Sequence, residues 1–211
     1  MEPQQLRISD FDYVLPEDRI ARYPAGERTG SRLLRYRDGQ LSEHHYADLP
    51  ELLPAGSLLV LNDSRVVEAR LLFQKKTGGK IEVFCLEHGP QYRDVSEGLR
   101  AAGSVAYYCL VGGASKWKFG ETLRLSLEHE NEAVSLQARI ISKENNRFLI
   151  RFDWEPATWN FAEVLHAAGQ IPLPPYLKRD ADALDSERYQ TVYAAQAGSV
   201  AAPTAGLHFT P

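Results

Sequence analysis

Six short segments rich in β-branched, aromatic and leucine residues follow one another in the middle of the chain, and they constrain the fold more than any other feature. They cover residues 66–73, 81–86, 105–111, 123–127, 134–141 and 148–152. Clusters of Gly, Asn and charged residues separate them, as is typical of antiparallel barrels and sandwiches. The sequence therefore predicts a compact antiparallel β-barrel or sandwich, with a helical or irregular insertion at 89–103.

The segment before this run mixes helix and strand patterns. Asp38-Gly39 accepts the positive φ angles of a tight turn, which predicts a hairpin between 31–37 and 41–46. A short helix is expected over 48–53. The apolar run 58–61 has the length of a buried strand.

Helical periodicity returns after the β-rich run. Asn160 and Glu163 have the spacing of a reciprocal helix cap, and Gly169 suits a left-handed helix end. These residues predict a helix over 161–168. A further helix is predicted over 187–194.

These patterns predict a mixed α+β fold in which an α/β domain carries an inserted antiparallel β domain. We expect the α/β domain to be discontinuous, over 1–65 and 153–211, and the barrel to cover 66–152. The chain closes on Thr210-Pro211, a helix-start signal with no helix after it. The α/β domain is therefore expected to be incomplete, truncated at its C-terminus.

Charge and composition exclude several classes. The 211 residues include 24 Lys and Arg against 28 Asp and Glu, a net charge of −4, so contact with nucleic acid requires a local basic patch. There is no basic, apolar leader and no run of 18 apolar residues, so neither a signal peptide nor a membrane span is predicted. Cys85 and Cys109 lack metal or redox spacing and are expected to be buried thiols. We expect a cytoplasmic protein.

The string GSVAAPTAGLHFT at 198–210 is the most unusual part of the sequence. Small residues around Pro203, Thr204 and Gly206 allow the backbone to approach a ligand closely. His208 follows, and imidazole transfers protons near neutral pH. The alternative is a tight surface loop with a packed histidine.

A polar tetrapeptide, 62–65, follows the apolar run, where open α/β folds place ligand-binding loops. Asn62 and Asp63 have groups that orient ribose hydroxyls, and Arg65 suits a carboxylate or phosphate. An Asx turn with a surface arginine is the alternative.

The segment TGGKIE at 77–82 joins two predicted strands. Gly79 exposes backbone amides, Lys80 adds positive charge and Glu82 a carboxylate, although the spacing of a P-loop is absent. Residues 65–80 contain five basic side chains and one acidic one, which makes them the best candidate patch for polyphosphate. A hairpin loop with solvated lysines explains the pattern equally well.

The segment 187–193 interleaves aromatic, amide and charged side chains. Tyr189 and Tyr193 would share one helix face and stack on a base, with Arg188 and Gln190 between them. Such a face is also typical of an amphipathic core.

The Gly-rich segment 110–121 offers Lys116, Trp117 and Lys118, which could stack on RNA and neutralise it, or form a barrel turn. The histidines lack partners at ligand spacing, so no metal site is predicted.

Six strings recur in a known order: SRLL at 31–34, LVLNDSRVVEARL at 59–71, TGGKIEVFCLE at 77–87, IPLPPYLKR at 171–179, ERYQTVYA at 187–194 and GSVAAPTAGLHFT at 198–210. Together they resemble the S-adenosylmethionine:tRNA ribosyltransferase-isomerase family of queuosine biosynthesis. Glu68 and Gly112-Gly113-Ala114 differ from the proline and the Arg-Pro-Gly loop usual there. The resemblance implies the N-terminal portion of such an enzyme, with an α/β half-barrel-like domain that carries an inserted β-barrel.

The resemblance implies S-adenosylmethionine as a substrate, tRNA as a partner, and neither cofactor nor membrane. The ribosyl portion is transferred to the 7-aminomethyl-7-deazaguanine base of tRNA and isomerised, giving epoxyqueuosine with release of adenine and methionine. The sulfonium acidifies the ribose C5′ protons, so a base starts the reaction, and the departing adenine takes up a proton.

On this hypothesis His208 handles a proton, with Asp63 or Tyr189 as alternatives. The expected substrate-binding residues are Asn62, Arg65, Gly79, Lys80, Glu82, Arg188, Gln190, Tyr193, Pro203, Thr204 and Gly206. The stretches around Asn62, Lys80, Tyr189 and His208 are expected to line one cleft. The alternatives are a non-catalytic tRNA-binding β-barrel module, an inactive fragment of the enzyme, or another enzyme that consumes S-adenosylmethionine.

Overall fold

The computed structural model describes residues 6–199 and 201–211. Its fold is mixed α+β, with many strands and few, short helices. The strands are β1 Arg32–Arg37, β2 Gln40–His45, β3 Ser64–Val66, β4 Arg70–Gln74, β5 Lys80–His88, β6 Ser104–Gly112, β7 Thr122–His129, β8 Glu132–Glu144, β9 Arg147–Glu155, β10 Gly169–Gln170 and β11 Gln196–Ser199. The α-helices are α1 Leu49–Leu52, α2 Val95–Leu99, α3 Phe161–Ala168 and α4 Ala183–Arg188. The 3-10 helices are η2 Ile8–Phe11, η3 Glu17–Arg19, η4 Arg28–Gly30, η5 Tyr46–Asp48, η6 Ala114–Lys116, η7 Pro175–Leu177 and η8 Thr204–His208.

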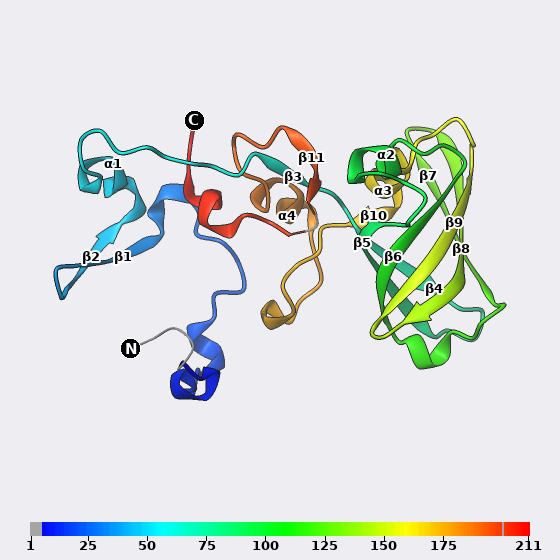
Figure 1. Cartoon of the computed structure of the whole chain (residues 1–211), viewed down its shortest axis with the longest axis horizontal. Helices are drawn as coiled ribbons and strands as arrows, with labels where there is room; N and C mark the ends of the chain where they lie inside the picture. Colours follow the sequence, from blue (N-terminus) through cyan, green and yellow to red (C-terminus); the bar gives the residue numbers. More distant parts are fainter. Residues whose placement is uncertain (1–5, 200) are drawn as a thin grey trace.

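Seven strands form one antiparallel sheet in the order β10-β4-β5-β6-β9-β8-β7. The sheet curls until β7 lies beside β4, and Figure 1 shows it at one end of the molecule. Five of the six predicted strands are confirmed as β5 to β9. The sixth, 66–73, is two strands instead, because the chain turns where the Ala69 amide donates to the Val67 carbonyl.

The core lies inside the curl, and alternation along the strands fills it. In β9, Phe148, Ile150, Phe152 and Trp154 are buried while their neighbours face outward. Helix α3 closes the curl with apolar side chains that belong to the same core: Phe161, Val164 and Leu165. Burying each such side chain contributes about 2 kcal/mol, so this sheet and α3 form one stable unit.

The predicted cap of α3 is confirmed, but the role predicted for Gly169 is wrong. The Glu163 amide donates to Asn160 Oδ1 over 3.0 Å, and the Asn160 amide donates to Glu163 Oε2 over 2.7 Å. Gly169 has φ −91°, which is not left-handed, and it starts β10. Glycine is needed there because a Cβ would lie 1.8 Å from the Glu68 carbonyl oxygen.

The two cysteines are buried thiols, as predicted. Cys85 and Cys109 face each other across β5 and β6 with their Sγ atoms 3.9 Å apart. Burial raises the pKa of the Cys109 thiol well above its usual value. Both side chains therefore act as small apolar core residues.

The predicted hairpin is confirmed as β1 and β2, which lie at the opposite end of the molecule from the curled sheet (Figure 1). Asp38 and Gly39 have φ of 52° and 78°, the pair of positive angles that a tight hairpin turn requires. The expected helix is confirmed as α1. The buried strand predicted at 58–61 is wrong: these residues lie outside every strand the structure describes, and Leu58 and Val60 are each 87% exposed.

The helix predicted over 187–194 is also misplaced. Helix α4 begins at Ala183, because Asp182 caps it by accepting from the Leu184 and Asp185 amides. The helix ends at Arg188. Tyr189 and Tyr193 therefore do not share a helix face. Strand β11 pairs in parallel with β3, so the C-terminal segment lies beside the entry to the curled sheet.

Candidate functional site

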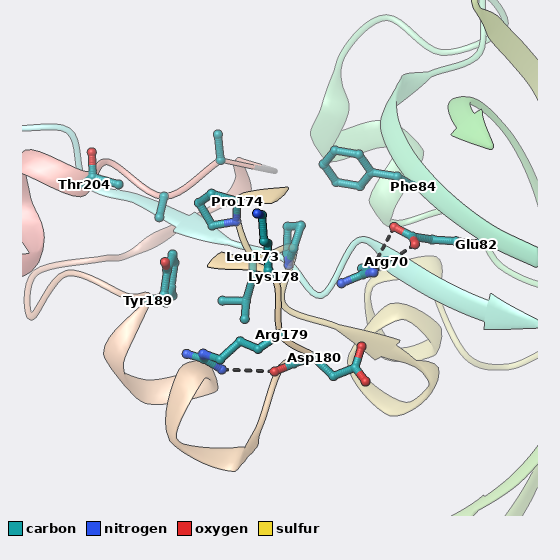
Figure 2. A pocket seen from close by; sticks show the side chains of 13 residues that line it. Arg70, Glu82, Phe84, Leu173, Pro174, Lys178, Arg179, Asp180, Tyr189 and Thr204 are labelled. Atoms are coloured by element: carbon teal, nitrogen blue, oxygen red, sulfur yellow. Dashed lines mark hydrogen bonds and ion pairs between the residues drawn. The ribbon is translucent and has the colours of Figure 1, made fainter. Parts of the chain in front are cut away.

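A cleft of about 690 Å³ lies between the outer face of the curled sheet and the segment that follows β10. It is lined by Arg70, Glu82, Phe84, Pro172, Leu173, Pro174, Lys178, Arg179, Asp180, Tyr189, Ala201, Ala202 and Thr204. Figure 2 shows the side chains of the sheet on one side and Tyr189 and Thr204 across from them. Segments far apart in the sequence therefore meet here.

The alternation of side chains along β5 places two residues on the sheet side of this cleft. Ile81, Val83 and Cys85 of β5 point into the core, so Glu82 and Phe84 project outward between them. Arg70 on neighbouring β4 holds the Glu82 carboxylate through two contacts, Nη2 to Oε2 at 2.8 Å and Nε to Oε1 at 2.7 Å. The cleft thus has an aromatic wall beside a fixed ion pair.

The opposite side is held by an ion pair between Arg179 and Asp185. The guanidinium donates to both carboxylate oxygens at 2.6 and 2.7 Å, and Asp185 is 1% exposed. Hydrogen bonding from Arg179 lowers the pKa of the Asp185 carboxyl. Arg179 also lies over the Tyr23 ring, 4.4 Å from its centre, and so joins the N-terminal segment to this wall.

Tyr189 faces both the cleft and a second hollow of about 380 Å³ beside it. Burial raises the pKa of its phenol above the usual value. A phenol keeps its proton at neutral pH even at the ordinary value, so the Tyr189 hydroxyl is available as a hydrogen-bond donor.

His208 lies in this second hollow with Arg188 and Tyr189. Its ring centre is 5.0 Å from that of Tyr46. Arg28 fixes the backbone before it by donating to the Leu207 carbonyl over 2.8 Å. The hollow therefore contains an imidazole and a phenol on a braced backbone.

Two predicted substrate ligands use their side chains to join segments. Gln190 donates to the Val66 carbonyl over 2.7 Å and accepts from the Val66 amide over 2.9 Å. Arg188 donates to the carbonyls of Ala25 and Gly26. Both side chains thus position β3 and the N-terminal segment against α4.

The tetrapeptide 62–65 lies outside both hollows. Asn62 Oδ1 accepts from the Ser64 amide over 2.8 Å, which is the Asx turn considered as the alternative. The Asp63 carbonyl accepts from Ala195 and Gln196 where β3 meets β11, and Arg65 is exposed.

The other predicted ligands divide between the cleft and other places. Glu82 and Thr204 line the cleft, and Pro203 precedes η8. Gly206 is packed so closely that a Cβ would lie 2.3 Å from Tyr193 Oη. Gly79 and Lys80 lie at the turn between β4 and β5, outside both hollows. The expectation that Asn62, Lys80, Tyr189 and His208 line one cleft is therefore wrong: Tyr189 and His208 share a hollow, and the other two lie elsewhere.

The sequence patterns did not indicate Phe84, Lys178 or Arg179 as site residues, and they indicated Arg70 only as one of the five basic side chains in 65–80. All four residues lie within strings that carry the family resemblance: 59–71, 77–87 and 171–179. The outward direction of Phe84 was available from the alternation of β5. The meeting of these strings depends on the fold of residues 171–180 against the sheet.

The part of the chain that the structure describes contains neither a cluster of metal-ligating side chains nor a helix able to span a membrane. No three His, Cys, Asp or Glu side chains in it are grouped as metal ligands. None of its helices has the length and hydropathy needed to span a membrane.

A family profile described as "Queuosine biosynthesis protein" matches residues 8–211. The chain is 39% identical over 206 residues to the S-adenosylmethionine:tRNA ribosyltransferase-isomerase of Trichlorobacter lovleyi, covering 96% of this chain and 54% of the relative. It is 41% identical to the enzyme of the same name from Dechloromonas aromatica, covering 97% and 52%. The relative from Anaeromyxobacter sp. is 42% identical, covering 97% and 54%. The chain spans about half the length of these curated relatives, and it belongs to the queuosine biosynthesis protein family.

Proposed function

We propose that this chain carries part of the active site of an S-adenosylmethionine:tRNA ribosyltransferase-isomerase. The reaction transfers the ribosyl portion of S-adenosylmethionine to the 7-aminomethyl-7-deazaguanine base of tRNA and isomerises it, giving epoxyqueuosine and releasing adenine and methionine. The observation that carries the proposal is the family match over residues 8–211, with relatives that bear this name. S-Adenosylmethionine is a substrate here, and we propose no further cofactor.

The cleft is the proposed pocket for S-adenosylmethionine and, beside it, the modified base of the tRNA. Its volume of about 690 Å³ falls within the roughly 300–1,000 Å³ of small-molecule sites. Phe84 and Leu173 supply apolar walls, and Glu82 and Thr204 supply groups that fix orientation. Positive and negative side chains both line it, which suits a ligand such as S-adenosylmethionine that carries both signs of charge.

Proton transfer is proposed for the second hollow. Tyr189 lines both this hollow and the cleft, so its phenol is a candidate hydrogen-bond donor to the departing adenine. His208, on the same hollow, can accept or donate. Asp63, on the loop before β3 and outside both hollows, is the third candidate for proton transfer.

The other predicted ligands keep separate proposed roles. Arg65 and Lys80 are exposed and suit tRNA phosphate or the methionine carboxylate. Asn62 is proposed to support the site by shaping the loop before β3 through its Asx turn. The rest are proposed to shape or support the site through their packing and hydrogen bonds: Gly79, Arg188, Gln190, Tyr193, Pro203 and Gly206.

We also propose that 66–152 is an inserted β-barrel domain within an α/β domain formed by 1–65 and 153–211. The run of β4 to β9 within 70–155 supports this division. Since α3 and β10 pack on the same sheet, they are proposed as the junction between the two domains.

Release of adenine tests the proposed function. The chain is incubated with S-adenosylmethionine and tRNA that bears the precursor base, and free adenine is quantified by mass spectrometry. Adenine that forms only when this tRNA is present supports the transferase. Adenine formed equally with tRNA that lacks the precursor base contradicts it.

A second candidate is a tRNA-binding module without catalysis, and four exposed lysines on the curled sheet and its loops favour it: Lys76, Lys80, Lys116 and Lys118. Binding of tRNA with no release of adenine supports this candidate. The same assay on a polypeptide of the relatives' full length then distinguishes an RNA-binding protein from a partial enzyme.

A further inference from the structure

Two loops that are far apart in the sequence lie together at one end of the curled sheet. The turn between β4 and β5 and the loop that holds η6 are joined by Lys75, whose Nζ donates to the Lys116 carbonyl and to Glu121. A Cβ on Gly79 would lie 3.8 Å from Lys116 Cδ. The two basic segments considered separately in the sequence therefore form one surface.

Four exposed lysines define this surface, which we name the lysine tip: Lys76, Lys80, Lys116 and Lys118. None of the four forms an ion pair with any residue that the structure describes. The nearby carboxylate of Glu121 is already bound to Lys75 at 2.9 Å. The tip is thus a concentrated positive patch on a chain of net charge −4.

The loop that carries half of the tip is held in place by its own packing. Trp117 is 4% exposed, and its indole donates to the Glu121 carbonyl over 3.0 Å. Gly113 has φ 74°, and a Cβ there would lie 3.0 Å from the Lys80 carbonyl oxygen. Of the two alternatives for this loop, stacking of Trp117 on RNA and a barrel turn, the turn agrees with the structure, because the Trp117 ring is in the core. The lysines beside it face solvent on a fixed loop.

The tip lies next to the cleft along β5. Lys80 and Glu82 are two residues apart on the same face of this strand, a rise of roughly 7 Å. Glu82 lines the cleft. A polyanion with one unit in the cleft would therefore bring neighbouring units over the lysines.

We propose that the lysine tip binds the phosphodiester backbone of the RNA substrate beside the nucleotide held in the cleft. This inference rests on the proposed function, which supplies tRNA as the substrate. Lysine binds phosphate as a flexible point charge, so the tip contributes affinity without reading sequence.

Salt dependence of tRNA binding tests the tip. The quadruple variant K76Q/K80Q/K116Q/K118Q is compared with the native chain by fluorescence anisotropy between about 50 and 200 mM salt. We expect tRNA affinity to fall at least tenfold at low salt. The slope of log K against log[salt] should fall by about three, since each lost phosphate contact removes roughly 0.7–0.9.

The matched control R7Q/R37Q/R93Q/R100Q removes the same charge from exposed arginines elsewhere. It should retain most of the native affinity and slope. The double variant K116Q/K118Q should lose about half of the slope change, and thermal unfolding confirms that each variant is folded.

Three outcomes separate the claims. If the quadruple variant keeps the native slope of log K against log[salt], the phosphate-binding role of the lysine tip is overturned and the proposed function is unaffected. Equal losses in the quadruple variant and the arginine control also overturn the tip, because general charge then explains the binding. If the native chain binds no tRNA, the proposed substrate fails and the tip with it.

Discussion

The curled sheet and the N-terminal part of the chain differ in how far their apolar side chains are buried. Strands β4, β5, β8 and β9 bury alternate side chains in a core that α3 shares. In residues 6–63 no side chain is fully buried, and apolar residues such as Leu58 and Val60 face solvent. A sheet that closes on itself supplies its own core, whereas extended segments and a two-stranded hairpin do not. Most of the stability should therefore reside in the sheet.

The largest expected effect comes from Phe161→Ala. This ring is fully buried against Tyr107, Phe152 and Trp154, so its removal should lower the free energy of unfolding by about 3–5 kcal/mol. Urea denaturation measures the loss. Phe11→Ala, in the exposed N-terminal part, should change stability by less than about 0.5 kcal/mol. Similar losses in the two variants would break the comparison.

Asp185→Asn should be next, since it leaves the half-buried guanidinium of Arg179 with only the more distant Asp182 carboxylate at 3.8 Å. We expect a loss of about 3 kcal/mol near neutral pH. Because the folded state lowers the pKa of Asp185, its contribution is present above the ordinary value of 3.8 and is lost as pH falls through the lower folded pKa.

Urea denaturation from pH 7 to pH 2 measures this dependence. The native chain should lose stability in acid that the Asp185→Asn variant does not lose. Asp12→Asn, an exposed carboxylate, serves as the control. An identical acid response of the native chain and the Asp185→Asn variant would rule out this role.

Gly169→Ala should have a smaller effect of about 1–3 kcal/mol, because the new methyl forces the Glu68 and Leu165 carbonyls to move. The change is read from the thermal midpoint. Gly26→Ala meets no atom within 4 Å and should leave the midpoint almost unchanged. A neutral Gly169→Ala would show that β10 does not need this close approach.

The smallest effect is expected from L58S/V60S. Both side chains are exposed, so the free energy of unfolding should change by less than about 0.5 kcal/mol. Denaturation in urea checks this. A loss above about 2 kcal/mol would show that this run is buried, as its sequence alone predicted.

Local sequence chemistry predicted the parts of the fold that depend on neighbouring residues. The Asp38-Gly39 turn, the cap at Asn160 and the strands β5 to β9 all follow from patterns within a few residues. The apolar run 58–61 was misjudged because burial depends on a partner strand. Helix α4 was misplaced because the cap at Asp182 starts it earlier than the periodicity suggested.

The candidate site was less predictable than the fold. Tyr189, Thr204, Glu82 and His208 were chosen for their chemistry, and the structure places each of them at one of the two hollows. Gln190 was chosen on the same grounds, yet its amide is used by the backbone of Val66. Residue type indicates what a side chain can bind, but its hydrogen-bond partners depend on distant segments.

Binding of S-adenosylmethionine to the cleft is the claim on which the account depends, and calorimetry of Phe84→Leu tests it most directly. Leucine keeps the packing of Phe84 but removes the ring face that a base would stack on, a loss of about 1–3 kcal/mol. We predict that S-adenosylmethionine binds the native chain and Ile141→Ala, an exposed change on β8, with equal affinity, and binds Phe84→Leu at least fivefold more weakly. Unchanged affinity in Phe84→Leu, or no binding to the native chain, would contradict the assignment of this cleft.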